Sequence, residues 1–253
     1  MNRAHLRRRW YRALERAPIA YCAWQRRFPD RNVVDARTDL LVEGYPSAAN
    51  TFTREALERA NPGIRIASHL HAVAHVLRAL HLDVPVLILL RPPVDSVVSV
   101  LARFPAQESD IASELRAYVR LYRGVLAVAD RVALASFENT TTRLGEVTGE
   151  LNRQLGTSFA RFDDSDPEAQ RIVQATIDGW TEAVFGADSE RHRALPSTER
   201  RAAASALRAE VRGPAHAALR AHAEALHRDL AAIARARFES PLQGEDAVAD
   251  RAG

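Results

Sequence analysis

Two segments of this chain join an apolar run, a tight turn and the start of a helix, which is an arrangement that binds anions. The first covers residues 39–52, where DLLVEG leads into the small residues of YPSAANTF. The second covers residues 86–99, where VLILL ends at Arg91. Backbone N–H groups in such a turn, with the positive end of the helix, surround a phosphate or sulfate whatever the side chains are. Two such sites on neighbouring strands predict a ligand with two anionic groups.

Arg91 ends an apolar strand, where its side chain is badly placed for bulk water. A guanidinium group offers a planar fork of N–H donors that matches phosphate in a bidentate way. A salt bridge is the alternative, and we favour ligand binding. Pro92 and Pro93 are expected to fix the start of the next helix and Asp95 to cap it, with Ser99 one turn further on the same face.

His69 follows another apolar run, and histidine is the commonest general base in enzymes. The alternative is a hydrogen-bonded histidine that simply ends a strand. The spacing of His69, His71 and His75 also resembles a metal site, since neutral imidazoles are common metal ligands. The sequence shows no well-placed carboxylate partner and no second cluster, so metal binding is disfavoured.

Apolar strands alternate with amphipathic helices, which predicts an α/β fold with a parallel sheet covered on both faces. Strands are expected at residues 39–43, 64–68, 84–90 and 132–137. Helices are expected at residues 51–60, 71–80, 95–103, 109–129, 141–155 and 172–185, with alanine- and arginine-rich helices over 198–237. Ligands of such folds bind at the carboxyl ends of the strands. Both anion-binding segments and His69 should therefore meet at one edge.

In this order the segments resemble the sulfotransferases that use 3'-phosphoadenosine 5'-phosphosulfate (PAPS), over roughly residues 38–155. PSAANTF at 46–52 stands where that family has its phosphosulfate loop, and the likeness is greatest to bacterial members with a Gly-Tyr/Phe-Pro-Arg-Ser-Gly-Asn-Thr-Phe loop. Arg91 and Ser99 match the pair that holds the 3'-phosphate. SHLH at 68–71 stands in place of Thr-His-Leu-Pro, and SFEN at 136–139 in place of a strand ending Tyr-Glu-Asp.

The resemblance implies a P-loop-like three-layer α/β fold with a central parallel sheet and an additional C-terminal helical region. It implies PAPS as co-substrate, no metal, and an acceptor hydroxyl on a carbohydrate, glycolipid or small molecule. His69 is then the catalytic base, and the aromatic rings of Phe52 and Phe137 either flank adenine or belong to the core. The residues implied in PAPS binding are Ser47, Ala48, Ala49, Asn50, Thr51, Phe52, Arg91, Ser99 and Arg193.

Two residues of the loop depart from the family pattern. Ser47 stands where a Lys or Arg bridges the sulfate and the leaving phosphate, and the loss of such a contact costs several kcal/mol of transition-state stabilisation. The chain has no lysine, so all 35 basic residues are arginine, and Arg54 and Arg65 are the nearest replacements in sequence. Ala49 replaces a glycine, which matters only where the backbone needs a positive φ angle.

Three regions are expected along the chain. Residues 1–37 form a basic N-terminal helical segment, residues 38–237 the sulfotransferase-like domain with its helical C-terminal part, and residues 238–253 a disordered tail. The N-terminal arginines fit either a helix packed on the core or weak contact with an anionic membrane surface. Arg191 or Arg193 would close over the 3'-phosphate, and the alternative is an exposed charged linker.

The 253 residues fit a single α/β core or a core with a helical appendage, in a compartment that is reducing or where disulfides are not needed. Cys22 is the only cysteine, so no internal disulfide forms. No apolar run is long enough for a transmembrane helix or a signal peptide, so we expect a cytoplasmic protein. No nucleic-acid-binding module accompanies the arginines, so nucleic acid is not an expected partner.

Three functions remain open from the sequence. The first is a PAPS-dependent sulfotransferase. The second is a degenerate, non-catalytic nucleotide-binding or scaffold protein of the same fold, motivated by Ser47 and Ala49. The third is a P-loop kinase or NTPase, which is poorly supported because the Gly-Lys-Ser/Thr ending of the phosphate loop is absent.

Overall fold

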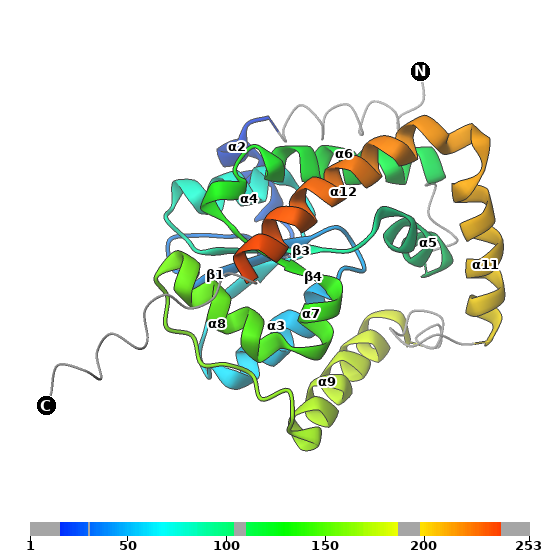
Figure 1. Ribbon diagram of the computed structural model, residues 1–253. Coiled ribbons are helices and arrows are strands. Elements are labelled where there is room, and N and C mark those ends of the chain that lie inside the picture. The colour runs from blue at the N-terminus through cyan, green and yellow to red at the C-terminus, as the bar shows by residue number, and fades with distance from the viewer. Residues whose placement is uncertain (1–15, 30, 104–109, 187–197, 239–253) are drawn as a thin grey trace, which may run out of the picture.

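The computed structural model describes residues 16–29, 31–103, 110–186 and 198–238, and a parallel sheet lies at its centre (Figure 1). The sheet has four strands in the order β2, β1, β3, β4. Their bounds are Leu40–Gly44 for β1, Ile66–Ser68 for β2, Val86–Leu90 for β3 and Ala133–Ser136 for β4. The prediction of a parallel α/β sheet is confirmed.

Helices cover both faces of this sheet and make three layers (Figure 1). The upper layer in that view holds α2 (Pro18–Gln25), α4 (Val73–His81), α6 (Ile111–Leu126) and α12 (Ala217–Phe238). The lower layer holds α3 (Asn50–Ala60), α7 (Phe137–Thr142), α8 (Leu144–Leu155) and α9 (Pro167–Phe185). Two further helices, α5 (Pro93–Arg103) and α11 (Thr198–Arg212), pack against each other. Short 3₁₀ turns lie at Ala129–Arg131 (η1) and Pro214–His216 (η3).

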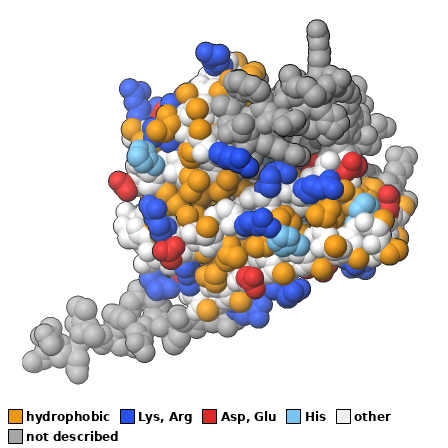
Figure 2. Space-filling model, turned by 90° about the horizontal axis from the view of Figure 1, so that it is seen from above, with side chains coloured by type: hydrophobic (Ala, Val, Ile, Leu, Met, Phe, Trp, Pro, Cys, Tyr) orange, Lys and Arg blue, Asp and Glu red, His pale blue; other side chains and the backbone are white. Residues whose placement is uncertain are grey.

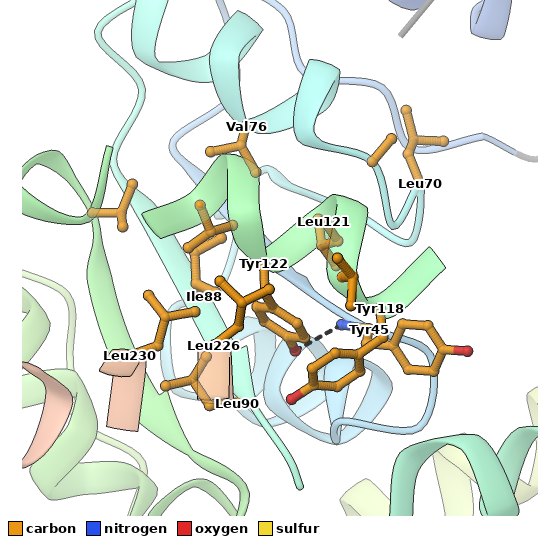
Figure 3. Packing of buried hydrophobic residues seen from close by; sticks show 14 of the residues in the cluster. Tyr45, Leu70, Val76, Ile88, Leu90, Tyr118, Leu121, Tyr122, Leu226 and Leu230 are labelled. Carbon is orange, nitrogen blue, oxygen red and sulfur yellow. Dashed lines mark hydrogen bonds between the residues drawn. The ribbon is translucent and has the colours of Figure 1, made fainter. Parts of the chain in front are cut away.

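Strand side chains alternate between an upper and a lower core, as the two-residue period of a strand requires. Leu41 of β1 and Ile88 of β3 belong to the upper core, whereas Val42 and Leu87 belong to the lower one. Figure 3 shows Ile88 in the upper core among side chains from α4, α6 and α12. Because the strands are covered on both sides, they read as continuous apolar runs in the sequence.

The chain leaves the sheet in opposite directions after β1 and after β3. From β1 it enters α3, which packs on the lower core, and from β3 it enters α5, whose buried side chains belong to the upper core. The strands β1 and β3 are neighbours, with Gly44 paired to Leu89. Where the connections of two adjacent parallel strands diverge, a crevice opens at their carboxyl ends, and ligands of α/β proteins bind there.

The N-terminal and C-terminal helices belong to the same layers rather than standing apart. Tyr21 and Cys22 of α2 are buried in the upper core, and α2 packs on α4. Helix α12 crosses the upper layer and contacts α6 and β4. The tail over 239–253 lies outside the described residues. The predicted extra C-terminal helical region is therefore present, with α12 in the upper layer and α11 packed on α5.

Arginine side chains are interleaved with hydrophobic ones on the face shown in Figure 2. A few acidic side chains lie among them. Among the helices of the described residues, none has the length and apolar character needed to cross a membrane.

Candidate active site at the carboxyl edge of the sheet

Each of the four strands delivers one part of the site from its carboxyl end. The turn at 45–49 follows β1, His69 follows β2, Arg91 follows β3 and Phe137 follows β4. The Arg91 guanidinium donates from Nη1 to the Ser47 carbonyl at 2.6 Å. Its carbon Cζ lies 4.3 Å from the centre of the Phe137 ring. The two segments predicted to bind anions therefore touch each other through Arg91.

The Arg91 side chain is partly buried. Burial lowers the pKa of Arg91 from its ordinary value, and the nearby Asp95 carboxylate opposes that shift. A guanidinium begins so far above neutral pH that it keeps its charge here. Phe137 is only partly buried, so it is a platform for Arg91 rather than a core residue. The site thus holds a cation that is partly removed from water, where it attracts anions more strongly.

The turn after β1 has free donors. The N–H groups of Asn50, Thr51 and Phe52, in the first turn of α3, donate to no atom of the described residues. The Asn50 side chain is buried and donates to the Tyr45 carbonyl at 3.1 Å, while its Oδ1 accepts no hydrogen bond within those residues. Gly44 precedes the turn, and a Cβ there would lie 2.7 Å from the Leu89 carbonyl oxygen. The free N–H donors suit an anionic ligand, whereas the unpaired Asn50 Oδ1 is an acceptor and would need a donor.

The backbone of this turn is strained at two residues. Ser47 has a φ of 68° and Ala49 a φ of 71°, so both are left-handed. A residue with a Cβ costs about 1–2 kcal/mol in that conformation. The glycine that Ala49 replaces would be unstrained here, so this departure from the family pattern falls at a position that favours glycine.

Neither predicted replacement for the missing loop cation is free to act as one. Arg65 precedes β2, so it lies at the amino edge of the sheet, away from the site, and this prediction is wrong. Arg54 pairs with Glu55 on the same helix and lies 3.7 Å from the Glu58 carboxylate. It still lies near enough to His69 to disfavour a second positive charge there.

A cation from far along the chain approaches instead. Arg208 of α11 donates to Asp95 of α5 at 2.6 Å, and both side chains are 41% exposed. Its positive charge contributes to the lowered pKa of Arg91, so the two guanidinium groups are close in space. The residue lies in an alanine- and arginine-rich helix, where the sequence gives no signal to single it out.

His69 is held between two hydroxyl groups. Its Nε2 lies 3.0 Å from the Thr51 hydroxyl and its Nδ1 lies 2.6 Å from the Ser68 hydroxyl. Burial, followed by the nearby His71, lowers the pKa of His69 from its ordinary value to about 3. The ring is therefore neutral at physiological pH, and it accepts a proton reluctantly. A polyanionic ligand in the adjacent turn would oppose this shift.

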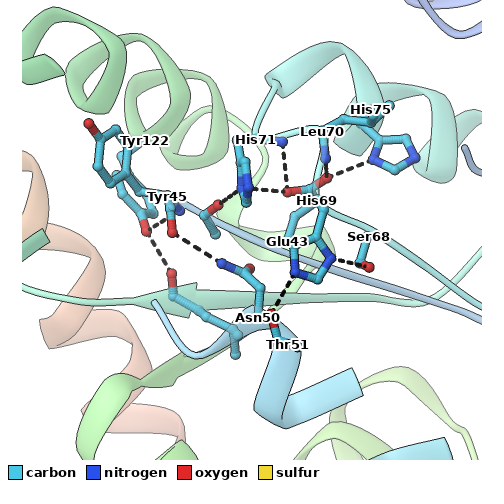
Figure 4. A network of polar contacts seen from close by, with 12 residues as sticks. Glu43, Tyr45, Asn50, Thr51, Ser68, His69, Leu70, His71, His75 and Tyr122 are labelled. Carbon is cyan, nitrogen blue, oxygen red and sulfur yellow. Dashed lines mark hydrogen bonds and ion pairs between the residues drawn. The ribbon is translucent and has the colours of Figure 1, made fainter. Parts of the chain in front are cut away.

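A fully buried carboxylate organises the histidine segment (Figure 4). Glu43 has 0% exposure and accepts hydrogen bonds from the N–H groups of Leu70 at 2.9 Å and His71 at 3.1 Å. It also contacts His75 Nδ1 at 2.7 Å. Burial raises the pKa of Glu43, but the hydrogen bonds from His75 and from the Leu70 N–H act against it, and the pKa lies below its ordinary value. The inference that the histidines have no carboxylate partner is therefore wrong.

His75 has a defined tautomer. The N–H of Val34 donates to His75 Nε2 at 2.9 Å, so Nε2 carries no proton and Nδ1–H donates to Glu43. Both ring nitrogens are used, and the side chain is fully buried. Within the described parts of the chain, no group of three or more His, Cys, Asp or Glu side chains is arranged to bind a metal.

The tyrosines of α6 brace the site from above. Tyr122 contacts both Tyr45 and Leu89, and Tyr118 donates to the Arg91 carbonyl at 2.8 Å. Tyr118 and Tyr122 are four residues apart, so they share a helix face. In the sequence, this spacing of the two tyrosines is what indicates a shared role, although the same spacing is typical of any helix that packs on a core.

Other predicted residues have mixed outcomes. Ser99 is partly exposed on α5 and makes no hydrogen bond with Arg91, whereas the Ser96 hydroxyl donates to the Arg91 carbonyl at 3.4 Å. Helix α5 begins at Pro93, so Asp95 lies inside its first turn, and the predicted cap is wrong by three residues. Phe52 packs edge-on against Phe162, with ring centres 6.3 Å apart. Arg191 and Arg193 lie outside the described residues.

The edge of the sheet thus combines unpaired backbone donors, a guanidinium shielded from water and neutral imidazole rings. This set of groups suits an anionic ligand and the removal of a proton from a neighbouring hydroxyl. Comparisons with protein-family models, with curated proteins and with solved structures found no match for this chain.

Proposed function

We propose that this chain is a sulfotransferase that moves a sulfuryl group from PAPS to a hydroxyl of a carbohydrate, glycolipid or small-molecule acceptor. The observation that carries the proposal is the contact between Arg91 and the turn after β1, at 2.6 Å. One nucleotide with a phosphosulfate at one end and a phosphate at the other spans two anion-binding segments that touch. The unpaired N–H groups of α3 fit the anionic end of such a ligand.

The reaction in this proposal is an in-line displacement at sulfur. The acceptor oxygen forms a bond to sulfur, the bond from sulfur to the bridging phosphate oxygen breaks, and its electron pair leaves with adenosine 3',5'-bisphosphate. The N–H groups of Asn50 to Phe52 hold the departing phosphate, and Arg91 anchors the 3'-phosphate. As in phosphoryl transfer, positioning and charge stabilisation supply most of the rate.

Titration calorimetry with adenosine 3',5'-bisphosphate and with ATP tests the donor. We expect selective binding of the bisphosphate by the native chain and its loss in Arg91→Ala. Arg171→Ala, which removes an exposed guanidinium from α9, is the matched control and should bind as the native chain does. Equal binding by Arg91→Ala would remove the support for this function.

A second function is favoured by the loop itself. Ser47 supplies no cation, and the left-handed Ala49 strains the turn. A nucleotide-binding or scaffold protein without transfer activity fits these two residues. It predicts bisphosphate binding with no sulfation of any acceptor, and a gain of activity in Ser47→Arg. Sulfate transfer by the native chain to any hydroxylated acceptor would exclude it.

A further inference from the structure

Three histidines lie beside the anion-binding turn, and they differ in which ring nitrogens are free. His75 uses both nitrogens, on Glu43 and on the Val34 N–H. His69 also uses both, on the hydroxyls of Ser68 and Thr51. His71 uses only Nδ1, which donates to the Gly44 carbonyl at 2.7 Å. Its Nε2 has no hydrogen-bond partner within the described residues.

The Gly44 contact determines which tautomer a neutral His71 ring adopts. A carbonyl oxygen only accepts, so the proton of the neutral ring is on Nδ1 and Nε2 presents a lone pair. The side chain is 24% exposed, so this nitrogen is within reach of a ligand. The histidine rings lie above the start of α3 (Figure 4), and the centres of His69 and His71 are 5.7 Å apart.

The buried Glu43 carboxylate lies beside the His71 ring. The carboxylate Oε2 lies 3.6 Å from His71 Nδ1, and the pKa of Glu43 is lowered, so it is ionised near neutral pH. An imidazolium formed by a proton arriving at Nε2 would face a buried negative charge, which is how a carboxylate supports a histidine base. His69 has two neutral hydroxyl partners instead, and the low pKa set by its burial opposes protonation.

The backbone is built to hold His71 in this place. Its φ of 51° is left-handed, and that of His69 is 67°. Glu43 accepts from the N–H groups of both Leu70 and His71, so the carboxylate fixes the segment that carries the strain. Strained residues that the surrounding structure holds in place are typical of functional sites.

We propose that His71, rather than His69, takes the proton from the acceptor hydroxyl, an inference that rests on the proposed transferase function. The acceptor O–H bond breaks, its proton goes to His71 Nε2, and its electron pair forms the new oxygen–sulfur bond. The electrons of the broken sulfur–oxygen bond leave on adenosine 3',5'-bisphosphate. His69 is then a positioning residue that holds the hydroxyls of Thr51 and Ser68.

The test compares His71→Asn with His69→Asn, using PAPS and two acceptors. Asparagine places an N–H donor near the position of Nδ1, so His71→Asn keeps a donor for Gly44 and removes only the base. At mildly alkaline pH 4-nitrophenol is largely ionised and needs no base, whereas phenol is neutral. We expect His71→Asn to lower transfer to phenol by about 100-fold or more while transfer to 4-nitrophenol changes little. His69→Asn should change both rates by the same small factor.

Each result has a defined meaning. Equal losses on both phenols in His71→Asn, or a loss confined to phenol in His69→Asn, would overturn the inference and leave the transferase function standing. Absence of bisphosphate binding by the native chain in calorimetry would instead overturn the proposed function itself. Unchanged bisphosphate binding by His71→Asn shows that the variant is folded and isolates the effect on the proton.

Discussion

The hydroxyl of Tyr122 joins the backbone of Tyr45 to that of Leu89. It accepts from the Tyr45 N–H at 3.0 Å (Figure 3). It donates to the Leu89 carbonyl at 2.6 Å. Ser47 follows the first of these residues and Arg91 follows the second, each by two positions. One buried hydroxyl from α6 therefore sets the spacing between the two segments that we propose to bind one nucleotide.

Tyr122→Phe should destabilise the protein by about 1–3 kcal/mol, because it leaves a buried N–H and a buried carbonyl with fewer partners. Urea unfolding measures this change. An unchanged m-value would show that the unfolding free energies of the variant and the native chain can be compared directly. Tyr118→Phe is the matched variant. The Tyr118 hydroxyl donates to the Arg91 carbonyl at 2.8 Å and has a longer second contact, with His227 Nδ1 at 3.3 Å, so its loss should cost less. Equal stability of Tyr122→Phe and the native chain would contradict the bracing role.

Ala49→Gly should stabilise the protein by about 0.5–1 kcal/mol. Glycine removes the strain of the left-handed residue, and the greater freedom of the unfolded chain offsets only part of that gain. Ala48 is the control, since its methyl group is buried and its φ is not positive, so Ala48→Gly should destabilise by about 1 kcal/mol. Thermal unfolding of the two variants measures these opposite changes in stability. A less stable Ala49→Gly would contradict the claim that Ala49 is strained.

His69 should make stability depend on pH. Its pKa is about 3 in the folded state, below the ordinary value of 6.5, so between these pH values the unfolded chain binds a proton that the folded chain does not. Stability should therefore fall as pH falls below 6.5, by about 2 kcal/mol at pH 5 from this residue. His69→Asn should lose that part of the pH dependence in urea unfolding at pH 7 and pH 5. If the unfolding free energies of the variant and the native chain fell by the same amount between pH 7 and pH 5, this would argue against a buried neutral His69.

Asp95 and Arg208 should affect bisphosphate binding in opposite directions. Arg208→Gln removes a cation near Arg91, whereas Asp95→Asn removes an anion and releases Arg208. Because the pair is partly exposed, we expect changes of only about 3-fold to 10-fold at low salt, weaker binding for Arg208→Gln and tighter binding for Asp95→Asn. Calorimetry at two salt concentrations checks this. Changes of the same sign in both variants would contradict the electrostatic explanation.

Local patterns in the sequence were sufficient to predict the sheet. The apolar runs that became β1 and β3 are unbroken because helices cover both faces, and the turn after β1 begins where small residues replace large ones. The predicted helix over 109–129 is α6, and that over 141–155 is divided into α7 and α8 by Arg143. Such boundaries depend on capping contacts that periodicity does not reveal.

Contacts between distant residues account for what the sequence did not show. Glu43 read as one position of an apolar strand, and its role depends on His75, which lies 32 residues away. Arg208 meets Asp95 across 113 residues. Ala49 is strained only if its backbone is left-handed, and the sequence alone does not show which conformation the backbone adopts there. Tertiary packing therefore determined most of the partners within the site.

The carbonyl of Ser47 already occupies a donor of Arg91, and this contact acts as an internal competitor for any incoming ligand. A measured affinity would report how much more strongly Arg91 binds the ligand oxygen than the Ser47 carbonyl oxygen, and not the full free energy of the new contact. Weakly charged oxygens would gain little by the exchange, whereas a dianion would gain much more. The site should therefore discriminate among ligands by charge more sharply than an arginine open to solvent would.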